Sequence, residues 1–184
     1  AGIVLPESTL RRALRWWEST ITPDRKTDRN AVASGSDTPQ GWGYGKGEDP
    51  YNTITAGGAG CLVIYEHLLK RDGRKSPKAR SSLAWLASHY WLNGPPKGAT
   101  PFWFYYYLYG IERVGVLFDS AVLGGRDWYF DGARWLLEQQ GADGAWEQNK
   151  LYPNPSNATY DTCFAVLFLK KATRPLTAST DPMR

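Results

Sequence analysis

Three short segments of the chain repeat one pattern of small and apolar positions. Each has a small residue, two further residues, a tryptophan and then another large apolar residue, and the copies lie at 13–17, 82–86 and 132–136. Apolar residues around each copy recur with the spacing of one helix face. A residue suited to begin a helix precedes each copy, namely Ser8 or Thr9, Pro77 and Asp127. The pattern predicts three amphipathic helices of one kind.

A second, more apolar segment follows each of these helices after a turn, at 53–70, 102–117 and 159–172. Helices that are apolar on nearly all sides belong in the interior. The glycine-rich run 56–60 lowers helix propensity, which favours a place where another backbone approaches closely. We therefore expect an all-α fold of six helices in three hairpins, repeated about every 50 residues, and no strand.

The length of 184 residues fits one domain, which we place at 1–184. The stretch 21–39 is polar and contains two prolines, so we expect an exposed loop insertion there. Residues 175–184 are expected to form a flexible tail.

Charge and hydropathy exclude two classes of partner. The net charge is +4, and the excess cations gather at 11–15 and 70–80. The longer cluster holds no aromatic residue that could stack on a base, so no nucleic-acid partner is expected. The longest apolar run, 102–118, contains Glu112 and Arg113, so no membrane span is expected either.

The turn after the third amphipathic helix carries the most specific pattern, with Gly132, Gln140, Gly144 and Trp146 at fixed spacing. Gly144 permits a tight reversal, and the Gln140 amide can bond exposed backbone groups. Trp146 is then placed to cover the junction between neighbouring helix pairs. A second, partial copy consists of Gln40, Gly41 and Trp42, with a degraded third at 91–94.

These spacings resemble the QW repeat of squalene-hopene and oxidosqualene cyclases, which protein prenyltransferase β subunits share more loosely. The segments 106–115 and 161–169 also look like those of bacterial prenyltransferase/squalene oxidase repeat proteins. The resemblance covers most of the chain, although Asp131 stands where the motif prefers a basic residue. It implies an α/α toroid, in which outer helices surround inner helices and a central cavity.

Toroids of that family close with about twice the helices counted here. The resemblance therefore implies that this chain is an arc, the C-terminal part of a longer protein. An open arc exposes apolar helix faces. We thus expect either the missing N-terminal half of the toroid or a second copy as a partner.

The chemistry of the family is present only in fragments. The acid motif of the cyclases falls on 158–162, where Asp161 remains as the one candidate catalytic residue and Tyr160 stands in the proton-donor position. Prenyltransferases hold zinc with an Asp-x-Cys pair and a later histidine. Asp161 and Cys163 reproduce the pair, but both histidines precede it, so the ligand set is incomplete and no cofactor is expected.

Ligand contact is expected from the aromatic stretch 102–109, which has too many large rings for one helix face. The candidate ligand-binding residues are Trp103, Tyr105, Tyr106, Tyr109 and Tyr160. The resemblance implies an apolar or isoprenoid-like small molecule in an aromatic cavity. Two alternatives stay open: a non-catalytic protein-binding or scaffold domain, and a glycan-active α/α toroid, for which no carboxylate pair is evident.

Overall fold

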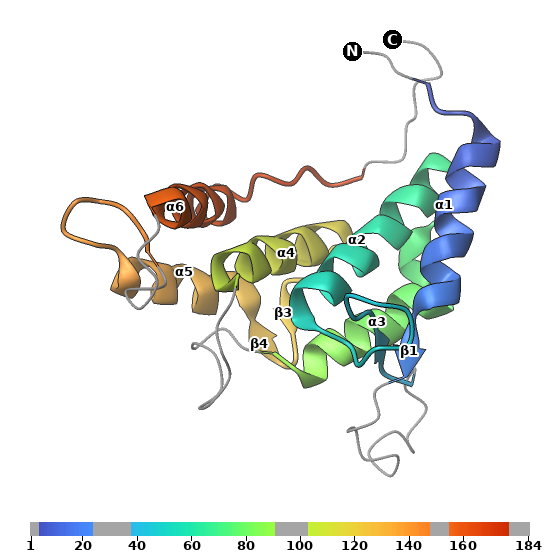
Figure 1. The fold of residues 1–184 in the computed structure, drawn as a ribbon, viewed down its shortest axis with the longest axis horizontal. Coiled ribbons are helices and arrows are strands. Elements are labelled where there is room, and N and C mark those ends of the chain that lie inside the picture. Colours follow the sequence, from blue (N-terminus) through green and yellow to red (C-terminus); the bar gives the residue numbers. More distant parts are fainter. Residues whose placement is uncertain (1–3, 24–37, 91–102, 148–154, 177–184) are drawn as a thin grey trace.

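The computed structural model describes residues 4–23, 38–90, 103–147 and 155–176 (Figure 1). These residues form six α-helices, as the periodicity predicts: α1 (Glu7–Thr20), α2 (Asn52–Leu68), α3 (Pro77–Ser88), α4 (Phe104–Leu117), α5 (Trp128–Gln139) and α6 (Pro155–Leu169). A short 3-10 helix, η2 (Gly73–Lys75), precedes α3. The all-α class is confirmed. The degraded turn at 91–94, most of the loop at 21–39 and most of the tail at 175–184 lie outside the described residues.

The expectation of no strand is wrong in detail, because two minimal ladders are present. Strand β1 (Thr22–Pro23) pairs antiparallel with β2 (Gln40–Gly41), and β3 (Val122–Leu123) pairs antiparallel with β4 (Arg126–Asp127). The first ladder brings together the two ends of the predicted loop insertion. The second is a tight hairpin whose central residues, Gly124 and Gly125, both have positive φ. Two-residue strands leave no alternating pattern in a sequence, which is why they were not expected.

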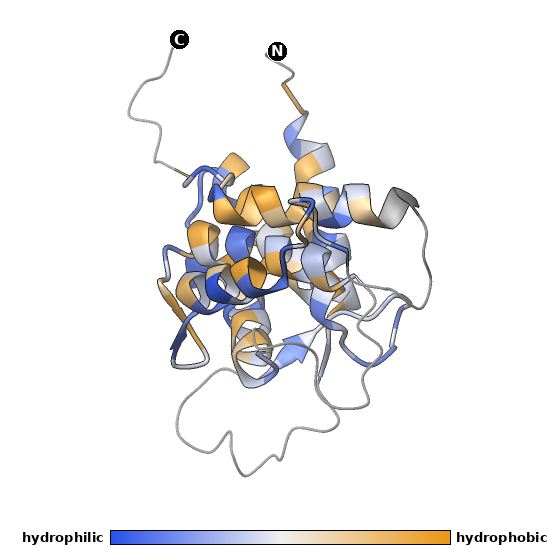
Figure 2. Cartoon of the chain, turned by 90° about the vertical axis from the view of Figure 1, so that its left-hand side faces the viewer, coloured by the Kyte–Doolittle hydropathy of each residue, from blue (hydrophilic) through white to orange (hydrophobic). Residues whose placement is uncertain are grey.

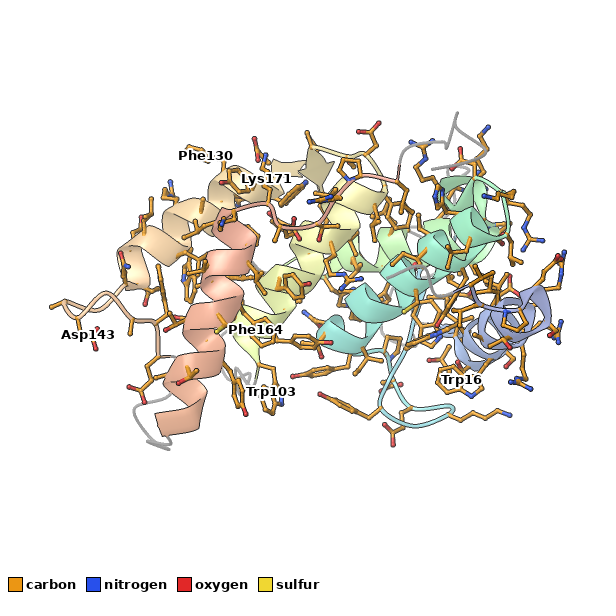
Figure 3. The ribbon with its side chains drawn as sticks, turned by 90° about the horizontal axis from the view of Figure 1, so that it is seen from above. Trp16, Trp103, Phe130, Asp143, Phe164 and Lys171 are labelled. Carbon is orange, nitrogen blue, oxygen red and sulfur yellow. The ribbon has the colours of Figure 1, made fainter. Side chains whose placement is uncertain are left out.

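The more apolar helices α2, α4 and α6 lie in one row, with α4 packed against both others (Figure 3). The amphipathic helices flank this row: α1 and α3 pack on α2, while α5 packs on α4 and α6. In Figure 1, α3 and α5 lie below the row. We call α2, α4 and α6 the inner row and α1, α3 and α5 the outer helices.

Two buried indoles join outer helices to the inner row in the same way. The Nε1–H of Trp42 donates to the carbonyl of Trp17 at the end of α1 (2.9 Å), and that of Trp146 donates to the carbonyl of Leu136 near the end of α5 (2.8 Å). The backbone N–H of each tryptophan donates to a threonine hydroxyl on the next inner helix at 3.0 Å: Thr55 for Trp42 and Thr162 for Trp146. Each hydroxyl donates back to the carbonyl of the same tryptophan at 3.3 Å.

The remaining turn residues differ between the two copies. Gln140 donates its amide to the Gly144 carbonyl (2.9 Å), and Gly144 has a φ of +83°, so it needs to be glycine. Gln40 instead accepts from the ammonium of Lys78 (3.0 Å), and Gly41 packs so tightly that a Cβ would meet Thr55. The tryptophan and the threonine therefore carry the shared geometry, whereas the glutamines do not.

The glycine-rich run of α2 makes room for a ring as well as for a neighbouring helix. A Cβ on Gly58 would lie 2.5 Å from the Trp42 indole, whereas one on Gly57 would meet nothing within 4 Å. The same arrangement recurs in α4, where a Cβ on Gly115 would meet the Trp128 indole. The expected close approach of a backbone is found at Ala56, whose Cβ would lie 3.0 Å from a Cβ on Gly110 of α4.

All three inner helices end in the same left-handed cap, formed without glycine. Lys70, Asp119 and Lys171 have φ values of 63°, 55° and 45°. In each case the N–H of the following residue bonds a carbonyl five residues back, as in Arg71 to Glu66 (2.8 Å). The equivalent bonds run from Ser120 to Gly115 (2.9 Å) and from Ala172 to Leu167 (3.1 Å). This cap aligns the three inner helices residue by residue.

A buried carboxylate fastens the segment that follows α6 across α4. Glu112 is fully buried and accepts from the Thr173 N–H (3.0 Å) and from the Thr173 hydroxyl (2.6 Å), 61 residues along the chain. Figure 1 shows this segment running back from α6 over the row towards α2. The neighbouring Arg113 bonds a different partner, Tyr109, because adjacent helix positions point in different directions.

Lys70→Gly should raise the free energy of unfolding by about 1 kcal/mol, because glycine adopts positive φ without the steric cost of a Cβ. Lys70→Ala removes the same charge but keeps the Cβ, so it should give no comparable gain. Urea unfolding of both variants measures the difference. Equal stability of the glycine and alanine variants would contradict the assignment of strain to this cap.

Trp146→Phe should lower the free energy of unfolding by about 1–3 kcal/mol, because it leaves the buried carbonyl of Leu136 without its hydrogen-bond donor. Thr162→Val, which removes the hydroxyl bonded to the same tryptophan, should cost a similar amount. Trp16→Phe is the control: its indole is exposed, and the change should be within about 0.5 kcal/mol. A loss at Trp16 as large as that at Trp146 would contradict the role given to the turn.

Candidate functional site

One side of the inner row is not covered by outer helices, and it gathers aromatic side chains. Tyr106 and Tyr109 of α4 lie against Phe164 of α6, with ring centroids 5.2 and 5.6 Å apart. The Tyr109 and Phe164 rings are stacked, at 28° between planes. Figure 3 shows Phe164 on the side of α6 that faces α4. We call the surface formed by Tyr106, Tyr109, Arg113, Cys61 and Phe164 the inner face.

Arg113 gives the inner face a single cation. Its guanidinium lies 5.7 Å from the Tyr109 ring centroid, and Nη1 donates to the Tyr109 hydroxyl at 3.4 Å. Within the described residues it makes no ion pair. The charge also acts on Cys61 of α2, whose pKa is raised by burial and lowered in smaller measure by Arg113. A face of stacked rings with one cation suits a molecule that is largely apolar with one anionic or polar end.

The predicted ligand residues are divided between two sides of the helices. Tyr106 and Tyr109 lie on the inner face, and Trp103 and Tyr160 are exposed near the N-terminal halves of α4 and α6. Tyr105 is not on this surface: it is buried against Trp135 at 5.6 Å, so it cannot touch a ligand there. Burial raises the Tyr105 pKa, with a further contribution from the charge of Asp161.

Asp161 and Cys163 do not converge on a metal. Asp161 is buried on the core side of α6, whereas Cys163 is exposed, because positions two apart on a helix point in different directions. Neither histidine joins them: His89 stacks on Trp85 at 4.1 Å, and His67 lies near the end of α2. Among the described residues, no three metal-ligating side chains gather at one place.

Phe164 and Arg113 were not among the sequence candidates for ligand contact, although both lie on the inner face. The signal that could have found Arg113 is the helical stripe 106, 109 and 113, which places it with the two tyrosines. Phe164 has no such signal, because its contact to α4 depends on how α6 packs.

A cavity of about 480 Å³ was also not anticipated. It lies between the ends of α2 and α4, and the segment after α6 closes one side of it with Pro175 and Leu176. The charges in its wall are largely compensated: Arg71 pairs with Glu66, and Arg74 pairs with Asp72 (2.9 Å) and Asp119 (3.8 Å). Mutual pairing leaves this cavity without a strong field of either sign.

Comparison of the chain with protein-family models, with curated proteins and with solved structures finds no match. Within the described part of the chain, none of the helices combines the length and the apolar character needed to cross a bilayer.

Cys61 offers a chemical probe of the inner face. Because its pKa is raised, less thiolate is present at a given pH, and the rate of iodoacetamide alkylation should reach its midpoint at a higher pH than for a free cysteine. The measurement uses Cys163→Ser, so that Cys61 reacts alone. Arg113→Gln removes the cation that favours the thiolate, so it should move the midpoint further upward.

Restricted access alone would slow alkylation of Cys61 equally at every pH and leave the midpoint in place. A midpoint at or below that of free cysteine, or a downward movement on Arg113→Gln, would contradict the environment described for this thiol. Cys61→Ser, which leaves the exposed Cys163 as the only thiol, provides the reference for an accessible site.

Proposed function

We propose that the chain is an arc of a squalene cyclase/prenyltransferase-like α/α toroid that binds an apolar, isoprenoid-like ligand on its inner face. The observation that carries this proposal is the arrangement of Tyr106, Tyr109 and Phe164, which offer ring surfaces from two inner helices on a side that no outer helix covers. Rings of this kind are normally buried, and a surface that presents several together marks a binding site.

Three features of the fold support the toroid. The inner helices lie in one row with the outer helices flanking it. Two turns use an indole and a threonine in the same geometry. The three inner helices share one cap. Repetition at the level of single hydrogen bonds is what a repeat array requires, because each unit must present the same surface to the next.

The energetics favour an extended ligand over a small one. Covering about 200 Å² of apolar surface contributes about 5 kcal/mol, which offsets only the lower end of the cost of association, about 4–15 kcal/mol. A ligand that touches only Tyr106 and Phe164 is therefore held weakly. A branched polyisoprenoid chain can also reach α2, where Ile54 is only partly buried, and its polar end can meet Arg113.

The described residues supply binding rather than catalysis. Protonating an unactivated alkene needs a strong acid on the inner face, and the one carboxyl group of the motif, Asp161, is buried. The same geometry argues against glycan hydrolysis, because no pair of carboxylates flanks the rings within the described part of the inner face. Reaction chemistry on this ligand would have to come from residues outside those described.

The proposal predicts saturable binding of geranylgeraniol, presented from cyclodextrin and followed by isothermal titration calorimetry. Phe164→Ala should weaken binding at least tenfold, since it removes the ring that both tyrosines contact. The matched control is Phe130→Ala, which deletes an exposed ring on α5 away from the inner face and should leave the dissociation constant unchanged.

Two results would overturn the proposal. One is no heat of binding for geranylgeraniol, and the other is equal weakening by Phe164→Ala and Phe130→Ala. Binding of a cello- or malto-oligosaccharide that Phe164→Ala abolishes, with none of geranylgeraniol, would replace the isoprenoid with a glycan as the ligand class.

A further inference from the structure

The outer helices can be aligned on their shared tryptophan, which makes Trp16, Trp85 and Trp135 equivalent. In the third repeat, Trp135 packs on the preceding inner helix, with its ring 4.7 Å from Phe104 of α4. Trp85 is only 3% exposed on α3, which packs on the preceding inner helix α2. Trp16 of α1 has no preceding inner helix in the described chain, and it is 58% exposed.

One helical turn earlier, the outer helices show the same contrast. Arg12 of α1 is exposed, whereas the equivalent Ser81 and Asp131 are buried. Positions four apart lie on one helix face. Arg12 and Trp16 therefore form a surface on α1, which we call the leading edge, that the other two outer helices bury.

The inner helices can be aligned on their shared cap, with Lys70, Asp119 and Lys171 equivalent. On α4, three positions at helical spacing are completely buried: Leu108, Ile111 and Val114. The equivalent positions on α6 are all exposed: Tyr160 at 54%, Cys163, and Val166 at 41%. On α2, the first two of these positions, Ala59 and Leu62, are again fully buried.

Tyr160, Cys163 and Val166 thus form a trailing edge on α6, whereas α4 buries all three equivalent positions and α2 buries the first two. Figure 2 views the molecule from the α6 end and shows apolar residues along this helix where it faces the viewer. Trp16 lies at the opposite end of the row (Figure 3). The arc therefore carries two unpartnered edges, one at each end, and each lacks the type of neighbour that the other provides.

We propose that a second copy of the chain docks its leading edge on the trailing edge of the first. In this interface α1 of one copy lies on α6 of the other as α5 lies on α4 within the chain. A second copy is the occupant that the observations favour, because one chain carries both complementary surfaces.

Charge supports the same pairing. Arg12 and Arg15 are exposed on α1, whereas the turn beside α6 exposes Asp143 and Glu147. The contact joins two different surfaces, so it closes into a ring or extends into an array. This inference does not depend on the proposed function, although a closed ring would turn the inner face towards an enclosed space.

The test is the oligomeric state of the 184-residue protein, measured by sedimentation velocity at about 1 to 100 µM, the range of typical specific association. The wild-type chain should form an oligomer. Trp16→Glu disables the leading edge and Val166→Glu disables the trailing edge, so each variant alone should associate at least tenfold more weakly.

A mixture of the two variants distinguishes this contact from any other. Each variant retains the edge that the other lacks, so an equimolar mixture should form a heterodimer through one intact interface. Its formation also shows that both variants are folded. Phe130→Glu is the matched control. Phe130 and its equivalents on the other outer helices, Arg11 and Arg80, are all exposed. This position therefore lies outside the contact, and association should be unchanged.

Several results would overturn the inference. A wild-type chain that is monomeric at 100 µM, about the upper end of that range, excludes a second copy as the occupant. Two variants that remain monomeric when mixed exclude the pairing of leading edge with trailing edge. Loss of association in Phe130→Glu as large as in Trp16→Glu places the contact elsewhere.

Discussion

The fold depends on the hydrogen bonds that two buried indoles make at the ends of outer helices. A helix terminus leaves several carbonyls without partners, and a terminus packed in the interior must find donors for them. Trp42 and Trp146 supply one donor each, and their backbone groups bond threonines on the next inner helix. The directions of α2 and α6 are thereby set by α1 and α5, the outer helices before them. Because the same geometry recurs, the hairpins add side by side.

A row built in this way leaves one side uncovered, and aromatic side chains gather there. The inner helices are apolar on most sides, so the residues on the open side include rings that a covered row would bury. Phe164 of α6 packs against Tyr106 and Tyr109 of α4, and the guanidinium of Arg113 lies over the Tyr109 ring. At the two ends of the described row, Trp16 of α1 and Val166 of α6 are likewise exposed.

Sequence patterns predicted the helices well because long amphipathic and apolar periods are set by local residue spacing. They failed where the outcome depends on packing between distant segments. Tyr105 was grouped with its neighbours by sequence, but helix geometry turns it into the core. Asp161 and Cys163 match the spacing of a zinc-binding pair, yet positions two apart on a helix point in different directions. The caps at Lys70 and Lys171 had no sequence signal, since lysine does not favour positive φ.

The bond between Glu112 and Thr173 has a consequence for how the protein is made. During synthesis α4 leaves the ribosome well before Thr173, which is 61 residues further along. Until then the carboxylate of Glu112 has neither of its two donors, and burying it without them is strongly unfavourable. The middle hairpin therefore reaches its final packing only after Thr173 has emerged, and not as soon as the hairpin itself has been synthesised.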